Sequence, residues 1–158
     1  MRIGHGYDVH ATGDGQGVTL GGVRIACDLA LRAHSDGDVV LHALADALLG
    51  AAALGDIGQH FPDDDAAWRD ADSRELLRRV CERVAAAGWQ PVNVDISVIA
   101  ERPRLRPHVD DMRTVIAGIL DLPHGAVSVK ATTHEGLDAL GRGEGIAAHA
   151  VCLLTAVD

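Results

Sequence analysis

The sequence predicts one α/β domain of the α+β type, residues 1–158, in which helices cover one face of a β-sheet. Segments with alternating polar and apolar residues, which are typical of strands, are interspersed with segments whose apolar residues recur at helical spacing. The length of 158 residues suffices for one well-formed core and requires no second one. Because 47% of the residues are hydrophobic but only 3% are aromatic, that core is expected to be mainly aliphatic.

The first part of the chain is expected to be rich in strands and loops. Residues 2–9 predict the first strand, and residues 14–17 form a cluster of turn-favouring residues. Residues 18–25 predict one or two short strands around a bend at the Gly-Gly pair.

The first helix is predicted over about residues 37–54. Ser35 followed three residues later by Asp38 resembles a capping box, and a long apolar run comes after it. Residues 55–65 contain two glycines, a proline and an acidic run, so they predict a long loop without helix or strand.

The rest of the chain alternates helices and strands by the same criteria. The segment at 101–107 concentrates three arginines after a strand, which favours either an anion contact or plain surface charge. In order, the expected elements are a helix from 73 to Gly88, a half-buried strand over 92–100, the loop 101–107, a helix over 108–120, a strand over 126–132, a glycine-rich turn at 141–145 and a last strand over 146–157.

Charge and cysteine content narrow the function. A net charge of -9, from 14 Lys and Arg against 23 Asp and Glu, argues against nucleic acid or an anionic membrane as partner. Cys27, Cys81 and Cys152 lack metal or redox spacing, and we interpret them as buried, reduced thiols of a cytoplasmic protein. The sequence has neither a signal-peptide pattern nor an apolar run of membrane-spanning length.

Three side chains suggest a metal site. On a strand, Asp8 and His10 project from the same face, and His42 on the first helix is the best candidate for a third ligand. One carboxylate and two imidazoles with an open fourth position are typical of catalytic zinc. Asp38 and Asp46 flank His42 at helical spacing, either as a solvated row or as carboxylates that orient the imidazole. The alternative is that these groups only satisfy one another at a surface.

Other polar motifs suggest a phosphorylated ligand. Backbone N–H groups at the start of the first helix, beside His34 and Ser35, suit a phosphate oxygen. Thr132 and Thr133 next to Glu135 suit a harder cation such as Mg²⁺. Each of these has an ordinary reading as a cap, strand or surface residue. No Walker loop, nucleophile elbow or dinucleotide fingerprint occurs, which argues against the chemistry typical of those motifs. Metal-assisted transfer at phosphorus is the class of reaction that remains.

Over essentially its whole length, the chain resembles the 2-C-methyl-D-erythritol 2,4-cyclodiphosphate synthase family. The motifs that carry the resemblance are RIGHGYDVH at 2–10, HSDGDV at 34–39, LLGA at 48–51, GDIG at 55–58, FPD at 61–63, ADS at 71–73, KATT at 130–133 with Glu135, and GRGEGIA at 141–147. The resemblance implies a phosphorus–oxygen lyase of the non-mevalonate isoprenoid pathway. Such an enzyme cyclises 4-diphosphocytidyl-2-C-methyl-D-erythritol 2-phosphate to 2-C-methyl-D-erythritol 2,4-cyclodiphosphate and releases CMP.

The resemblance also implies an assembly and its metals. It implies a homotrimer of mixed sheets that face the three-fold axis, with active sites between subunits and a central channel that can bind isoprenoid diphosphates. Zinc would be held by Asp8, His10 and His42. Magnesium or manganese would lie with the substrate diphosphate near Glu135.

By the same resemblance, His34 and Thr133 would be catalytic and would stabilise the transition state. The implied substrate-binding positions are Asp8, His10, His34, Ser35, Asp56, Ile57, Gly58, Phe61, Pro62, Asp63, Asp64, Asp65, Ala100, Glu101, Arg102, Pro103, Arg104, Leu105, Arg106, Ala131, Thr132, Thr133, His134, Glu135, Ala139 and Arg142.

The sequence departs from the family pattern at three positions. His134 stands where a small polar residue is usual, Ala139 where an aromatic residue is frequent, and Tyr7 in place of a frequent Phe. Two alternatives to the cyclising lyase differ in their products. A metal-dependent phosphoesterase would activate water and release phosphate or an open-chain monophosphate, and a trimeric diphosphate-binding protein would turn nothing over.

Overall fold

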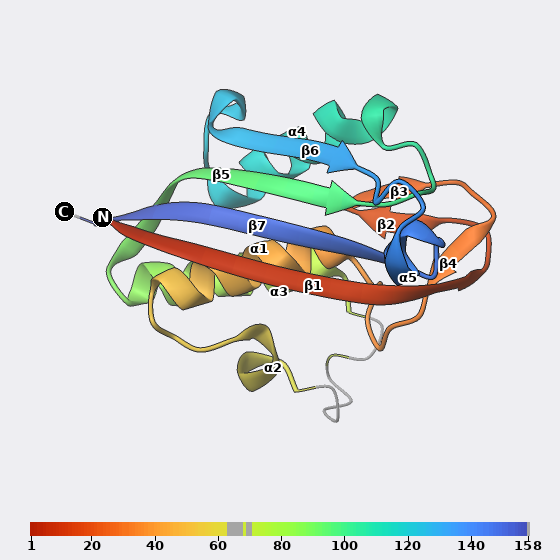
Figure 1. Ribbon diagram of the computed structural model, residues 1–158. Coiled ribbons are helices and arrows are strands. Elements are labelled where there is room, and N and C mark those ends of the chain that lie inside the picture. Colours follow the sequence, from red (N-terminus) through yellow and green to blue (C-terminus); the bar gives the residue numbers. More distant parts are fainter. Residues whose placement is uncertain (63–67, 69–70, 158) are drawn as a thin grey trace.

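The computed structural model describes residues 1–62, 68 and 71–157 (Figure 1). Its centre is a five-stranded sheet in the order β4-β1-β7-β5-β6. All neighbouring strands run antiparallel except β5 and β6, so the predicted mixed sheet is confirmed. The five strands are β1 (Arg2–Asp14), β4 (Leu29–Leu31), β5 (Trp89–Ile99), β6 (Val127–Thr132) and β7 (Gly145–Ala156), and a separate hairpin consists of β2 (Val18–Leu20) and β3 (Val23–Ile25).

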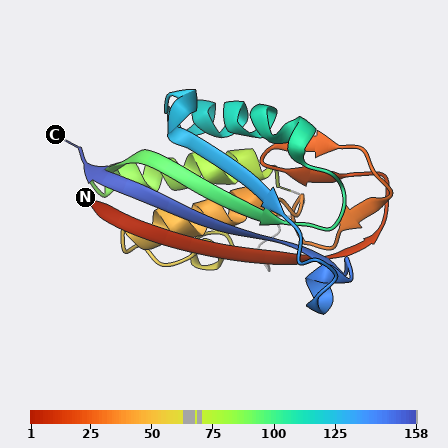
Figure 2. The same ribbon diagram turned by 45° about the horizontal axis from the view of Figure 1, so that its top comes forward.

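The three long helices lie on one face of this sheet, as predicted (Figures 1 and 2). They are α1 (Val39–Ala51), α3 (Ser73–Ala86) and α4 (Val109–Leu120), and two short helices are α2 (Ile57–His60) and α5 (Asp138–Gly141). The burial along β1 alternates accordingly, because Gly4 and Gly6 are buried while Ile3 and Tyr7 are exposed. The core is aliphatic and continuous between sheet and helices.

Several element predictions need correction. β1 extends to Asp14, beyond the predicted end, because its last residues pair with β4, a strand that was not predicted. The segment at 55–65 was predicted to contain no helix, yet α2 forms within it, since the Asp56 side chain accepts a hydrogen bond from the Gln59 amide at 2.9 Å. β5 begins at Trp89, earlier than predicted, and α5 occupies the start of the predicted glycine-rich turn.

The start of α1 differs from a capping box, because Asp38 itself is the N-cap. Its carboxylate accepts the amides of Val40 and Leu41, each at 3.1 Å, and those of Gly21 at 2.9 Å and Gly22 at 2.7 Å. Burial raises the pKa of Asp38 to about 6, although these amides pull the pKa down. The N–H groups of Val40 and Leu41 therefore already have a partner, and the phosphate contact expected beside His34 and Ser35 stays a prediction.

The two ends of the chain lie close together. Both ends of the chain lie at the same end of the sheet, where Arg2 of β1 pairs with Leu154 of β7 (Figure 1). All three cysteines are free thiols, of which Cys152 is buried and the other two are partly buried. Within the described residues, no helix combines the length and the hydropathy needed to span a membrane.

Helix α1 lies unusually close to strand β1. A Cβ atom added at Gly6 would stand 1.9 Å from the carbonyl oxygen of Ala43, and one at Gly4 would stand 1.9 Å from that of Ala47. These contacts are with backbone, which cannot move aside as a flexible side chain could. Glycine on β1 and alanine on α1 therefore set the distance between the helix and the sheet.

We expect Gly6→Ala to lower the free energy of unfolding by about 3 kcal/mol, because overpacking against backbone must push α1 away from β1. The matched control is Gly118→Ala on the exposed face of α4, where an added Cβ meets nothing within 4 Å. That change should raise stability by about 0.5–1 kcal/mol, as expected for Gly to Ala within a helix. Urea unfolding at neutral pH measures both, and equal effects of the two substitutions would contradict the close-approach argument.

Candidate metal centre and active-site cavity

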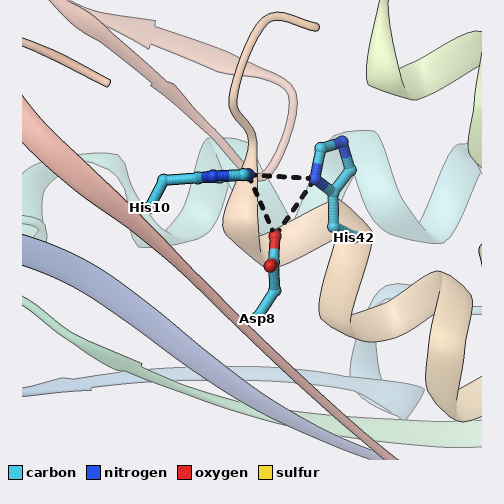
Figure 3. Close-up of side chains that lie close together, drawn as sticks. All are labelled: Asp8, His10 and His42. Atoms are coloured by element: carbon cyan, nitrogen blue, oxygen red, sulfur yellow. Dashed lines mark hydrogen bonds and ion pairs between the residues drawn. The ribbon is translucent and has the colours of Figure 1, made fainter. Parts of the chain in front are cut away.

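The close approach of α1 to β1 also gathers the predicted metal ligands. Asp8 and His10 lie on the same face of β1 as Gly4 and Gly6, so they point toward α1, which carries His42 (Figure 3). Asp8 Oδ2 lies 3.2 Å from His10 Nε2 and 3.1 Å from His42 Nδ1, and the two imidazole nitrogens are 3.4 Å apart. These three residues are the metal triad.

The geometry of the metal triad fits a zinc ion. Ligand atoms held about 2.0–2.1 Å from a tetrahedral Zn²⁺ are about 3.3 Å from one another, which matches the three separations. All three side chains are partly buried, and one oxygen with two nitrogens is a common zinc donor set. Within the described part of the chain, no other group of three or more His, Cys, Asp and Glu side chains gathers in this way.

The electrostatics of the triad favour an ionised carboxylate. Burial by itself would raise the pKa of Asp8, but hydrogen bonds and charge from His10 and His42 hold it well below its usual value. Burial lowers the pKa of His42, yet the hydrogen bond and the negative charge of Asp8 raise it overall. The carboxylate is thus ready to bind a cation, whereas each imidazole must be neutral at its ligating nitrogen.

The two aspartates predicted to orient His42 do not contact its ring. Asp38 points to the hairpin glycines, as described above, and Asp46 accepts a hydrogen bond from the Ile57 amide at 2.7 Å. The outer nitrogen of the ring, Nε2, instead lies 2.8 Å from the Ser73 hydroxyl and 3.4 Å from that of Ser35. The predicted carboxylate row is therefore wrong as an account of the orientation of His42.

The metal triad opens into a cavity of about 650 Å³. This size is typical of a small-molecule site. The predicted site residues that line it are Asp8, His10, His34, Ser35, His42, Ile57, Gly58 and Phe61. The residues that line it without having been predicted as site residues are Arg32, Ala33, Asp46, Trp68 and Leu76.

Some of the unpredicted lining residues carried a signal in the sequence. Asp46 stands one helical turn after His42, and this spacing alone places both side chains on the same face of α1. Trp68 has no comparable local signal. Its ring packs edge-on against Phe61, with the ring centroids 4.9 Å apart, so its position depends on a contact that spacing does not encode.

A second set of predicted residues gathers away from this cavity, and we call it the β5–β6 group. It consists of Ala100–Arg106, which follow β5, and Ala131–Glu135 at the end of β6. The two segments are joined by hydrogen bonds from the Ala100 amide to the Thr132 carbonyl at 3.0 Å and from the His134 amide to the Glu101 carboxylate at 2.9 Å. Leu105 is buried in the core, so its side chain is structural.

Within one subunit, the β5–β6 group lies away from the metal triad. Strand β6 is three positions from β1 in the sheet, which corresponds to at least about 14 Å at the usual strand spacing. Glu135 does not line the cavity and does not belong to the metal triad. The predicted second metal position and the predicted zinc position are therefore in separate places within this subunit.

The remaining predicted residues lie elsewhere. Asp56 caps α2, and Pro62, Ala139 and Arg142 do not line the cavity. The Arg142 guanidinium pairs with Glu144 at 2.6 Å, and His134 pairs with Asp138 at 2.9 Å. The predicted residues Asp63, Asp64 and Asp65 lie outside the described part of the chain.

Comparison with known proteins finds one family and several similar proteins. A model of the YgbB family matches residues 1–155. A 2-C-methyl-D-erythritol 2,4-cyclodiphosphate synthase of Salinibacter ruber is 63% identical over 154 residues, which cover 98% of each chain. The structure of the bifunctional IspDF from Campylobacter jejuni has a TM-score of 0.95 at 43% identity, covering 99% of this chain and 42% of that chain. A CDP-bound 2C-methyl-D-erythritol-2,4-cyclodiphosphate synthase has a TM-score of 0.90 at 38% identity, covering 98% of this chain and 100% of the other.

Removing one imidazole should remove the metal. We expect His10→Ala to lose most of its bound zinc, because two ligands hold the ion far less tightly than three. Elemental analysis after dialysis against a weak chelator gives the zinc content of each protein. His124→Ala, which changes an exposed histidine outside the triad, is the control and should retain zinc like the wild type. Equal zinc in both variants would exclude the triad as the binding site.

Proposed function

The chain belongs to the YgbB family and has 2-C-methyl-D-erythritol 2,4-cyclodiphosphate synthase activity in the non-mevalonate isoprenoid pathway, and we propose that the reaction takes place at the metal triad. The observation that carries this proposal is the geometry of the triad. It presents zinc-type donors at zinc-type separations, and it opens into a cavity large enough for a small phosphorylated substrate.

The proposed substrate is 4-diphosphocytidyl-2-C-methyl-D-erythritol 2-phosphate. An oxygen of its 2-phosphate forms a new bond to the β-phosphorus, and the bond from that phosphorus to the CMP oxygen breaks. CMP leaves with the bonding electron pair, and the product is the cyclic diphosphate. Because the substrate supplies its own nucleophile, no side chain of the protein has to attack phosphorus. The protein has to position the substrate and neutralise its negative charge. CDP-bound structures of relatives support a cytidine-diphosphate-linked ligand.

Asp8, His10 and His42 would hold zinc in this mechanism. The ion would supply Lewis-acid chemistry toward the phosphate groups of the substrate. His34 and Ser35 line the same cavity, where they can donate hydrogen bonds to phosphate oxygens and favour the transition state. Arg32 adds a positive charge to this wall of the cavity, which matters because the protein as a whole is acidic.

The β5–β6 group would complete the site from a neighbouring subunit. Thr133 is proposed as a second group that stabilises the transition state, and Glu135 as a ligand of magnesium or manganese bound with the diphosphate. The backbone of Ala100–Arg106 and Ala131–Thr133 would bind the cytidine. Both Thr133 and Glu135 are exposed, so they are available to a ligand held by another subunit.

The proposed assembly is a homotrimer whose sheets face the three-fold axis. The support for it is the sheet face opposite the helices, where Ile3, Tyr7, Val9 and Val151 leave between 39% and 74% of their surface exposed. Such an apolar band on β1 and β7 favours burial against another copy. A ring of head-to-tail interfaces would place the metal triad of one subunit beside the β5–β6 group of the next.

A central channel that binds an isoprenoid diphosphate and a cytoplasmic location are further parts of this proposal. An isoprenoid diphosphate would enter along the face that carries Tyr7, whose ring lies 4.8 Å from that of His149, and Ala139 and Arg142 would lie near that channel. We further propose that residues 1–158 act as one domain in the cytoplasm, without a nucleic-acid or membrane partner, in agreement with the acidic surface and the free thiols.

The product distinguishes the synthase from its alternatives. Zinc-loaded protein with magnesium should convert the diphosphocytidyl substrate to equal amounts of CMP and the cyclic diphosphate, which chromatography and ³¹P NMR resolve. His42→Ala should release CMP at least 100-fold more slowly, because it loses a zinc ligand. Release of inorganic phosphate would indicate a phosphoesterase, and tight binding without products would indicate a binding protein.

Mixing two inactive variants tests the site between subunits. His42→Ala damages only the metal triad, and Glu135→Gln damages only the β5–β6 group. Co-expressed in equal amounts, they should recover about a quarter of wild-type activity, because random trimers contain that fraction of interfaces with both halves intact. Co-expression of His42→Ala with His10→Ala is the control and should recover nothing, since both damage the same half. A site contained in one subunit would give no recovery in either mixture.

A further inference from the structure

His42 is held on both sides of its ring. Its Nδ1 atom faces the metal triad, as described above, and its Nε2 atom lies 2.8 Å from the Ser73 hydroxyl oxygen. Ser73 is the first residue of α3, and only 1% of it is exposed. The hydroxyl is thus a fixed, buried partner on the side of the imidazole away from the triad.

Ser73 is in turn bound to Asp36, in the loop before α1. Its backbone amide donates to Asp36 Oδ2 at 2.9 Å, and its hydroxyl donates to Asp36 Oδ1. The same carboxylate accepts the amide of Asp38 at 3.2 Å, which ties it to the start of α1. The three groups therefore form a continuous chain from the Asp36 carboxylate through the Ser73 hydroxyl to the His42 ring.

The direction of these hydrogen bonds fixes the position of the imidazole proton. A serine hydroxyl has one proton to donate, and Ser73 gives it to the Asp36 carboxylate. The serine oxygen can then only accept from His42, so Nε2 must carry the ring proton. In the neutral imidazole that can bind a metal ion, Nδ1 is then left with the free electron pair, on the side of the ring that faces Asp8 and His10.

We propose that Asp36 and Ser73 are positioning residues of the metal centre, which hold His42 in the tautomer and orientation that ligate through Nδ1. This inference rests on the proposed zinc-dependent function and assigns it two residues that do not themselves bind the ion. In metalloenzymes, a carboxylate often orients a ligating histidine directly, and removal of such a partner typically weakens metal binding 10–100-fold. Here the serine hydroxyl lies between the carboxylate and the histidine.

Zinc affinity, measured by competition with a chromophoric chelator, tests the proposal without reference to turnover. Ser73→Ala and Asp36→Asn should each weaken zinc binding about 10–100-fold. The double variant should be little worse than either single one, because the two residues act in series. Thr114→Ala is the control, since that hydroxyl donates only to the Asp110 carbonyl of its own helix, and its affinity should equal that of the wild type.

Two further measurements separate positioning from a purely structural role. Ser73→Thr retains the hydroxyl and should recover most of the affinity, and Asp36→Asn covers the case in which Ser73→Ala does not fold. Long-range ¹H–¹⁵N NMR of the zinc-loaded wild type should show the His42 proton on Nε2. Folded variants that bind zinc as tightly as Thr114→Ala, or a wild-type proton on Nδ1, would overturn the inference. A wild type that binds no zinc would instead overturn the proposed function.

Discussion

The direct packing of α1 on β1 through Gly4 and Gly6 is the constraint on which the rest of the structure depends. It removes the layer of side chains that normally separates a helix from a sheet, and it places backbone against backbone. On this same face of β1, the next two positions carry Asp8 and His10 rather than glycine. The short distance between the two elements brings His42 within ligand distance of both. Fold stability and metal-site geometry therefore depend on the same contact.

The two halves of the proposed site lie at different places on the subunit. Each subunit is acidic, and its substrate carries several phosphate charges, so neutralisation has to be local. The metal triad lies on β1 and α1, whereas the β5–β6 group lies at the ends of β5 and β6, which are two and three positions from β1 in the sheet. In the proposed oligomer, the two halves would meet only when subunits assemble.

Much of this could be predicted from sequence, because the signals were local. Alternation along the strands predicted the sheet, and the positions of Asp8, His10 and His42 indicated the triad, with a surface cluster as the alternative. What could not be predicted depends on contacts between distant segments. Strand β4 is three residues long and exists because β1 pairs with it. The role of Asp38 depends on Gly21 and Gly22, and that of Ser73 on Asp36, and no periodicity encodes such partners.

The neighbouring chain ends have a consequence for how such a domain can be connected to others. Arg2 and Leu154 pair at one end of β1, whereas His10 lies eight residues further along the strand, roughly 26 Å away. A domain fused to either end would start far from the cavity at the metal triad. A short linker between the two ends would permit a circularly permuted chain. In the bifunctional IspDF from Campylobacter jejuni, the part that matches this chain is 42% of that chain.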